Sequence, residues 1–325
     1  MLNRPVAAFR ALILAILAAS LLSPQAQAAF PERPIKMVVG YAAGGPSDII
    51  ARLLAAKLSE LLGQQVYVEN RAGASGNIAT EVVSRATPDG YTLLMATLPN
   101  AVNETLYPDF KYKFGKDIVA VAPVADTSLV AVVNPSLGVK SIAELIAFTK
   151  AHPGELYATA GRGTATHLAG ELFSLATDAK LVPVHYKGGG ETIKDLMSGQ
   201  VKLMFSSIPP VLGLVREKTL LGLATTGLKR DPTLPDLPTI EEAGLPSFNL
   251  SLWYGIAAPA GTPEEVIQRL DAATAEALKD PKLMGSLAQN GYHPMGGTRK
   301  DFTDFVQSEV QKWKKVVESS STMRQ

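Results

Sequence analysis

The sequence predicts an α/β protein of two doubly wound lobes, and three observations carry this prediction. Strand-like and helix-like segments alternate along the chain, which is typical of parallel sheets covered by helices on both faces. The alternation falls into two separate blocks, and the second block starts at Leu129 and is broken once at His152-Pro153-Gly154, so two lobes are expected. The 325 residues are too many for one small core and suit two modest domains.

The N-terminal residues have the pattern of a secretory signal peptide. Two arginines precede a run from Ala11 to Leu22 that is apolar except for one serine, and Ala26-Gln27-Ala28 offers a small-x-small cleavage pattern. The alternative is a membrane anchor, but twelve residues fall short of the roughly 20 that a helix needs to span a bilayer. We therefore expect a signal peptide over residues 1–28 and an exported, periplasmic protein that begins near Ala29.

The mature chain is expected to open with three strands and two helices. Ile35 to Val39 is a short apolar run typical of a buried strand, and a helix with leucines on one face follows it and stops at Gly63. The other elements expected here are strands at Val66 to Glu69 and Tyr91 to Ala96, and a helix at Ile78 to Ser84.

A second block begins at the apolar strand Leu129 to Val133. Ser141-x-x-Glu144 has the spacing of a capping box and opens a helix that ends near Lys150. After the break, the remaining elements are expected as strands at Leu156 to Thr159, Leu181 to Tyr186, Val201 to Phe205 and Leu221 to Thr225, and as helices at His167 to Leu175 and Thr192 to Met197.

The C-terminal part is expected to add one strand and two helices. Leu250 to Ala257 is strand-like, Thr262 suits an N-cap, and Pro263 suits the first helical position. The last helix carries an apolar stripe that should dock the C-terminus onto a lobe. Its members are Phe302, Phe305, Val306, Val310, Trp313 and Val317.

Composition excludes several functions. The 31 basic and 30 acidic residues give a net charge of +1, which provides no field for binding nucleic acid. The chain has no cysteine, which excludes disulfides, thiolate metal sites and a cysteine nucleophile. Its four histidines show no ligand spacing, and nucleotide-loop, zinc-protease and serine-hydrolase motifs are absent. We therefore expect no cofactor, no metal and no catalysis.

Three glycine-rich turns each follow an expected strand and precede an expected helix. They contain Gly44-Gly45, Gly161 to Thr166, and Gly188 to Gly190. Such turns lie beyond the carboxyl ends of strands, where open helix N-termini and missing side chains suit a carboxylate or phosphate. The alternative is that the glycines only make tight turns. Three such turns with polar residues at the helix starts favour an anion site.

Several side chains near these turns are candidates for ligand contact. The Thr164 and Thr166 hydroxyls either cap a helix or bind a ligand oxygen, and Arg162 could pair with a carboxylate, unless it is simply solvated. We interpret His167 as a hydrogen-bonding or packing residue rather than a base. Three aromatic residues either wall a pocket or pack in the core: Tyr41, Trp253 and Tyr254.

The order of short motifs along the mature chain resembles a known family. These motifs are Gly40-Tyr41-Ala42-Ala43-Gly44-Gly45-Pro46-Ser47-Asp48, Glu69 to Asn77, Gly163-Thr164-Ala165-Thr166-His167-Leu168, Tyr186-Lys187-Gly188-Gly189-Gly190, Leu234 to Ile240, Trp253-Tyr254-Gly255, and Ala258 to Pro263. Together they resemble the extracytoplasmic solute receptors of tripartite tricarboxylate transporters, the Bug family. Each motif is weak alone, but the combination is specific.

The resemblance implies a type II periplasmic-binding-protein fold with the ligand between two lobes. The crossing segments should lie near Leu129 to Val133 and Asn249 to Ile256, with residues 29–128 plus 253–325 in lobe 1 and 129–252 in lobe 2. It also implies capture of a small carboxylate for a membrane permease, without catalysis. Nothing in the sequence requires more than a monomer.

The resemblance further implies which residues hold the ligand carboxylate. Carried over by motif, they are Tyr41, Gly45, Asp48, Gly163, Thr164, Thr166 and His167, with less support Thr97 and Asn100. Two positions depart from the family pattern, because Ser206 stands where many members have Asp and His185 where many have Pro. A neutral hydroxyl cannot pair with an ammonium group. We therefore expect a dicarboxylate or aromatic acid, not an amino acid, with its far end at Arg162 or Ser206.

Two other functions stay open at this level. A ligand-sensing module for a signalling receptor would hold its ligand in the same way. A cleft hydrolase using Ser206 or His167 is the weaker alternative, because the sequence shows no nucleophile–base–orienter set.

Overall fold

The computed structural model describes residues 30–110, 112–186, 189–246, 248–320 and 323, and for 189–190 the backbone alone. The expected signal peptide therefore lies outside the described residues, as do Lys187 and Gly188 of the third glycine turn. Residues 33–325 form one compact unit. Within the described residues, no helix is long and apolar enough to cross a membrane.

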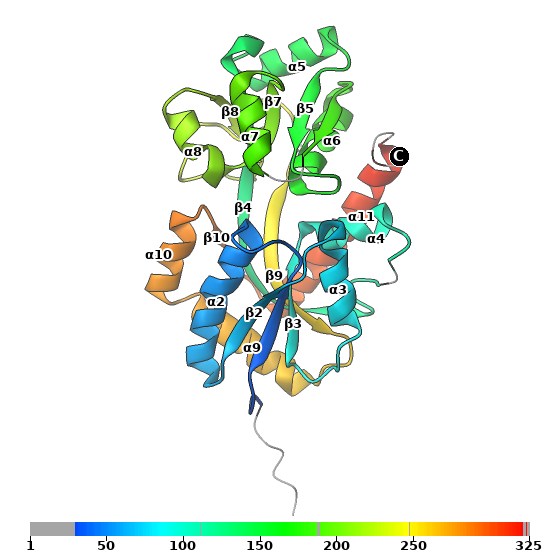
Figure 1. The fold of residues 1–325 in the computed structure, drawn as a ribbon, viewed down its shortest axis with the longest axis vertical. Coiled ribbons are helices and arrows are strands. Elements are labelled where there is room, and N and C mark those ends of the chain that lie inside the picture. Colours follow the sequence, from blue (N-terminus) through cyan, green and yellow to red (C-terminus); the bar gives the residue numbers. More distant parts are fainter. Residues whose placement is uncertain (1–29, 111, 187–188, 247, 321–322, 324–325) are drawn as a thin grey trace, which may run out of the picture. The chain divides into compact units, whose positions relative to one another are not determined.

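Lobe 1 is built on a mixed sheet whose parallel part comes from the N-terminal block. Strand β1 pairs in parallel with β2 and β3, β3 pairs antiparallel with β9, and β9 pairs antiparallel with β4 (Figure 1). These strands are β1 Ile35–Val39, β2 Val66–Asn70, β3 Thr92–Thr97, the first part of β4 Ile118–Val133, β9 Ser251–Pro259 and β10 His293–Pro294. The helices are α2 Pro46–Leu62, α3 Asn77–Ser84, α4 Leu98–Leu106, α9 Glu264–Ala277, α10 Pro281–Gln289 and α11 Arg299–Ser319.

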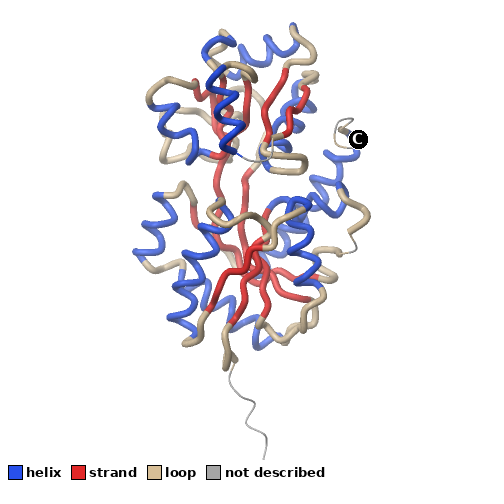
Figure 2. Tube along the Cα trace, in the orientation of Figure 1, coloured by secondary structure: helices blue, strands red, loops and turns tan. Residues whose placement is uncertain are grey.

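Lobe 2 is built on a second sheet. In it β5 pairs in parallel with β6 and β7, while the last part of β4 pairs antiparallel with β7 and β8. The strands are β5 Leu156–Thr159, β6 Val182–His185, β7 Leu203–Ser207 and β8 Leu221–Thr225. The helices are α5 Ile142–Ala151, α6 Ala165–Thr177, α7 Gly189–Ser198 and α8 Ile208–Arg216. In both lobes helices flank the strands (Figure 2).

Two neighbouring strands connect the lobes. Strand β4 pairs with β9 as far as Ser128 and with β7 from Leu129 onward, so it passes from one sheet into the other between these two residues. Strand β9 runs beside it (Figure 1). The predicted α/β fold of two lobes joined by two crossing segments is confirmed. The sequence predicted only the part of β4 from Leu129 to Val133. The earlier part was missed because Pro123, Asp126 and Thr127 are residues that strands disfavour or that interrupt an apolar run.

Four of the six residues of the C-terminal stripe are buried, whereas Phe305 and Val310 are partly buried. Phe302, Val306, Trp313 and Val317 are at most 3% exposed, and the Trp253 ring meets Phe302 edge-on at 5.8 Å. Burying one such phenylalanine contributes about 1.5–3 kcal/mol. This packing holds helix α11 against lobe 1.

Two capping predictions need correction. Pro263, not Thr262, is the N-cap of α9, because the Thr262 hydroxyl instead donates to the Pro259 carbonyl at 2.8 Å. Ser141 does cap α5 through the Glu144 N–H at 3.1 Å, but the Glu144 carboxylate accepts from the N–H of Lys140 rather than from that of Ser141.

Candidate functional site

A cavity of about 800 Å³ lies where both lobes meet the crossing strands. Its walls come from the turn after β1, the 3₁₀ turn Ala74–Gly76, the start of α4, the turn after β5, the start of α6, and the crossing segments. The lining is neutral except for one residue, because among the described lining residues only Arg162 carries a charge.

The first glycine turn is anchored from behind by Asp48. Its carboxylate accepts hydrogen bonds from the Gly44 N–H, from Arg52 Nε and from Asn70 Nδ2, each at 2.9 Å. Burial opposes ionisation of Asp48, but the hydrogen bonds from Arg52, Gly44 and Asn70 outweigh it and lower its pKa to about 2. Asp48 therefore shapes the turn and does not line the cavity.

The helix behind this turn begins without a side-chain cap. Gly45 is the N-cap of α2, and Pro46 has no N–H to offer. The N–H of Ser47 has no acceptor within the helix, and Ser47 lines the cavity. The start of α2 therefore provides a donor and a partial positive charge to an anion.

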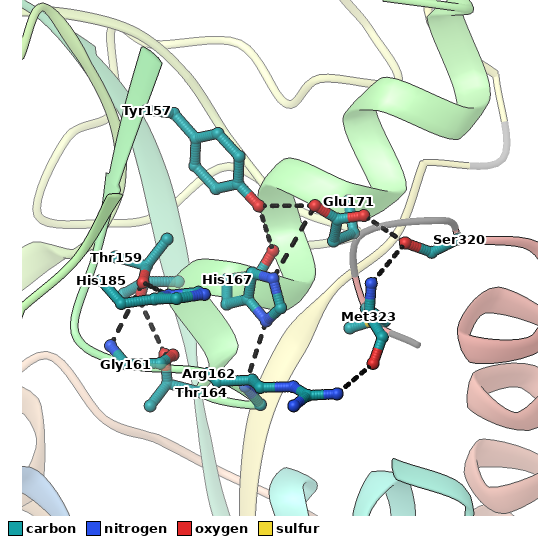
Figure 3. A network of polar contacts seen from close by, with 12 residues as sticks. Tyr157, Thr159, Gly161, Arg162, Thr164, His167, Glu171, His185, Ser320 and Met323 are labelled. Carbon is teal, nitrogen blue, oxygen red and sulfur yellow. Dashed lines mark hydrogen bonds and ion pairs between the residues drawn. The ribbon is translucent and has the colours of Figure 1, made fainter. Parts of the chain in front are cut away.

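The turn before α6 is held together by its own hydroxyls. Thr164 donates to the Gly161 carbonyl at 2.6 Å (Figure 3). Thr166 Oγ1 accepts from the Ala160 N–H at 2.9 Å. The first N–H groups of α6, like those of any helix, have no acceptor within the helix. Neither hydroxyl caps them, so they also lack a side-chain acceptor. Lobe 1 thus brings the uncapped start of α2, and lobe 2 that of α6, to the same cavity.

His167 supports this turn from inside lobe 2. Its Nδ1 accepts from the Gly163 N–H at 3.0 Å, and its side chain is fully buried. Burial, with the neighbouring charges of His185 and Arg162, lowers the pKa of His167 to about 3. The imidazole is therefore neutral and is not part of the cavity wall, so it positions the turn.

Among the described residues, no carboxylate compensates the charge of Arg162. No ion pair between described residues includes it, and its Nε is buried without a hydrogen-bond partner. Its Nη2 donates to the carbonyl of Met323, which is neutral (Figure 3). A cation in this setting is stabilised by an anionic ligand.

The lobes also contact each other at the edge of the cavity. Ser75 Oγ, from lobe 1, donates to the Arg162 carbonyl at 2.8 Å. The carbonyl of Ser75 accepts from Tyr41 OH at 3.3 Å and from Asn103 Nδ2 at 2.9 Å. Burial raises the pKa of Tyr41 to about 12, so its phenol is a neutral donor.

The sequence-predicted site residues divide into two groups. Those that line the cavity are Tyr41, Gly45, Thr97, Arg162, Thr164 and Thr166. Those behind the lining are Asp48, Asn100, Gly163, His167 and Ser206. Asn100 Oδ1 accepts from the N–H of Thr97 at 2.7 Å, and Ser206, fully buried, donates to the Ser207 carbonyl.

Other lining residues were not singled out as site residues by the sequence. They include Ser47, Ser75, Tyr107, Ser207 and Leu252. Trp253 and Tyr254 are neighbours in β9, so their side chains point to opposite faces of the sheet. Trp253 packs against α11, whereas Tyr254 lines the cavity and its buried hydroxyl has no hydrogen-bond partner. Ser47 was signalled by its place next to Gly45-Pro46. Ser75 and Tyr107 gave no comparable signal.

Alternative sites are less suitable. A groove of about 850 Å³ on lobe 1 lies between the end of α4, residues 113–116 and α11. Its Arg299 is already paired with Glu264 at 2.8 Å, and Lys314 lies 4.0 Å from Glu318. Among the described residues, no cluster of three or more His, Cys, Asp or Glu side chains is arranged to hold a metal ion.

Comparisons with known proteins show the family of the chain. The model of the tripartite tricarboxylate transporter family receptor matches residues 50–321. Protein BugT of Bordetella pertussis is 38% identical over 305 residues, which cover 93% of this chain and 94% of BugT. A Rhodopseudomonas palustris protein solved with adipate is 35% identical with a TM-score of 0.79, covering 89% of this chain and 97% of its own. MatC from R. palustris with bound malate is 31% identical with a TM-score of 0.78, covering 89% and 100%.

Proposed function

Since the chain belongs to the tripartite tricarboxylate transporter receptor family, we propose that it captures an amine-free dicarboxylate between its lobes and presents it to a membrane permease. The family and the similar structures are periplasmic solute-binding receptors rather than enzymes, and they share the type II periplasmic-binding-protein fold expected from the sequence. What remains to be proposed is the ligand, its contacts, the lobe boundaries and the partner.

The observation that carries the proposal is the charge of Arg162. In the described part of the cavity, a guanidinium without an acidic partner and the uncapped starts of α2 and α6 favour two anionic groups on one ligand. We place one carboxylate at the starts of α2 and α6, within reach of Thr164 and Thr166, and the other at Arg162. The relatives solved with adipate and malate hold ligands of this class.

An amino acid suits this cavity less well. The described lining contains no carboxylate that could pair with an ammonium group, because Asp48 is engaged behind the turn. An ammonium group would also lie in the same cavity as Arg162. Ser206 cannot receive the far end of the ligand as the sequence suggested, so Arg162 takes that role alone.

The mechanism is a hinged clamp. We assign residues 29–128 plus 253–325 to one rigid lobe and 129–252 to the other, with bending at the crossing strands. A ligand that touches both lobes favours closure by its differential affinity for the closed state. A micromolar affinity corresponds to roughly −8 kcal/mol, which a few charge-assisted bonds supply.

Calorimetry with the mature protein tests the ligand class. We expect adipate and malate to bind at least roughly ten-fold more tightly than hexanoate, aspartate and glutamate, because only the former supply two anions without a cation. Aspartate or glutamate binding far more tightly than any amine-free acid would refute the proposal. Co-purification with membrane permease subunits, rather than a signalling receptor, separates transport from the sensing alternative.

A second contact between the lobes predicts a dependence on pH. His293 of β10 lies 2.9 Å from Asp231 of lobe 2, opposite Asp126 of β4. The hydrogen bond to Asp231 outweighs burial and raises the pKa of His293, with a further contribution from Asp126. Burial opposes ionisation of Asp231, but hydrogen bonds from His293 and Thr233 hold its pKa below the usual value.

We expect adipate affinity to fall roughly two- to five-fold as pH rises through the raised pKa of His293. A raised pKa means that His293 holds its proton more tightly in the closed form than in the open form. The His293–Asp231 contact therefore stabilises the closed form fully below the ordinary histidine pKa of about 6.5, and this stabilisation is lost as pH rises through the raised pKa. Calorimetry from about pH 6 to about pH 8.5 measures the effect. His293→Gln keeps a neutral hydrogen-bond donor, and its adipate affinity should depend less on pH. The same profile in both proteins would contradict the prediction.

A further inference from the structure

The last described residues of the chain extend from lobe 1 to lobe 2. Helix α11 packs on lobe 1 and ends where the Ser320 N–H donates to the Val316 carbonyl at 3.0 Å. Beyond it, the Met323 N–H donates to Ser320 Oγ at 3.1 Å. Ser320 is 3% exposed and Met323 is fully buried, so both are packed against the protein.

Ser320 is bonded to the helix that begins at the site. Its hydroxyl donates to Glu171 Oε2 on α6, and Glu171 Oε1 accepts from Tyr157 OH at 2.8 Å (Figure 3). Glu171 is 4% exposed, which makes these hydrogen bonds costly to break. The end of α11 is thereby joined to the lobe 2 helix whose first turn lines the cavity.

Met323 contacts the charged residue of the cavity directly. Its carbonyl accepts from Arg162 Nη2, while the Arg162 backbone carbonyl is held from lobe 1 by Ser75. A neutral carbonyl orients the guanidinium without cancelling its charge, and Arg162 Nε is left buried and without a partner. The arginine is fixed at both ends and still has donors for an anion.

We propose that Ser320 and Met323 form a positioning strap that fixes the Arg162 guanidinium for the second carboxylate of the ligand. The inference rests on the proposed function, because it concerns selectivity for two carboxylates over one. A long side chain that is held in its bound orientation before binding loses less freedom on binding. The strap therefore adds to dicarboxylate affinity and leaves monocarboxylate affinity almost unchanged.

The test compares Met323→Ser with Met323→Leu in the full-length mature protein. Serine removes the buried side chain that seats the strap, whereas leucine keeps it apolar and similar in volume. We expect Met323→Ser to weaken adipate binding roughly three- to ten-fold and hexanoate binding less than about two-fold in calorimetry. Met323→Leu should bind adipate and hexanoate with the affinities of the native protein. Ser320→Ala, which loses the hydroxyl bonded to Glu171, is the second variant should Met323→Ser fold poorly.

A double-mutant cycle shows whether the strap acts through Arg162. In an Arg162→Ala background, Met323→Ser should weaken adipate binding no further. Equal weakening of adipate and hexanoate, no weakening of either, or an effect that persists without Arg162 would each overturn the inference. A native protein that binds neither adipate nor malate instead refutes the proposed ligand class, and the inference with it, before any variant is needed.

Discussion

Replacing Arg162 by methionine is expected to weaken adipate binding at least roughly 30-fold while hexanoate binding changes less than about three-fold. Losing one partner of a desolvated charge pair costs about 2–5 kcal/mol, and only adipate has a second carboxylate for Arg162 to bind. Methionine retains an unbranched apolar stem, so packing beside the cavity is largely kept. Isothermal calorimetry with both acids measures the two affinities.

Arg162→Lys provides the control for charge. Lysine restores the positive charge without the planar fork, so an intermediate affinity for adipate is expected. If Arg162→Met weakened both acids equally, the arginine would be stabilising the closed protein rather than contacting the ligand.

Gly163→Ala is expected to weaken binding of adipate and hexanoate alike, roughly ten-fold, by hindering closure. Gly163 has φ +75°, and an added Cβ would lie 2.8 Å from Leu106 Cδ2 and 3.5 Å from Ser75 Oγ, both in lobe 1. Its left-handed conformation also costs a non-glycine residue about 1–2 kcal/mol. Backbone strain at residue 163 destabilises the open and the closed protein alike. The clash with Leu106 destabilises only the closed protein, because it arises when the lobes meet. Small-angle X-ray scattering with saturating adipate should show a more open protein.

Gly138→Ala is a matched control for backbone strain. Gly138 has φ +79° and nothing within 4 Å of an added Cβ, so the variant should lose stability without losing affinity. Adding Leu106→Ala to Gly163→Ala should recover part of the affinity by removing the clashing methyl group. Equal loss of affinity in the two glycine variants would show that strain, and not the lobe contact, is responsible.

The sequence predicted most strands and the first two glycine turns because their signals are local. The strands Ile35–Val39, Leu156–Thr159 and Leu221–Thr225 have the expected bounds, since apolar runs between turn residues determine them. Helices α4, α8 and α10 were missed. Prolines near their starts looked like turns, although proline is favoured in the first helical turn.

Which side chains face the ligand depends on tertiary contacts and was harder to predict. Asp48 is an acidic residue in a first helical turn, so its position near the helix start was visible, but its hydrogen bond to the Gly44 N–H depends on the conformation of the turn. Ser206 and Ser207 differ only in which side of β7 they occupy, and a one-residue difference reverses the direction of a side chain. The hydrogen bond from Ser75 to Arg162 joins residues 87 positions apart, and no local sequence pattern predicts it.

A crystal structure of the mature protein with adipate tests the central claim most directly. We predict one carboxylate within hydrogen-bonding distance of the starts of α2 and α6, and the other on the Arg162 guanidinium, with Nη2 still bonded to Met323. Adipate held by one lobe alone, or with both carboxylates remote from Arg162, would contradict the account.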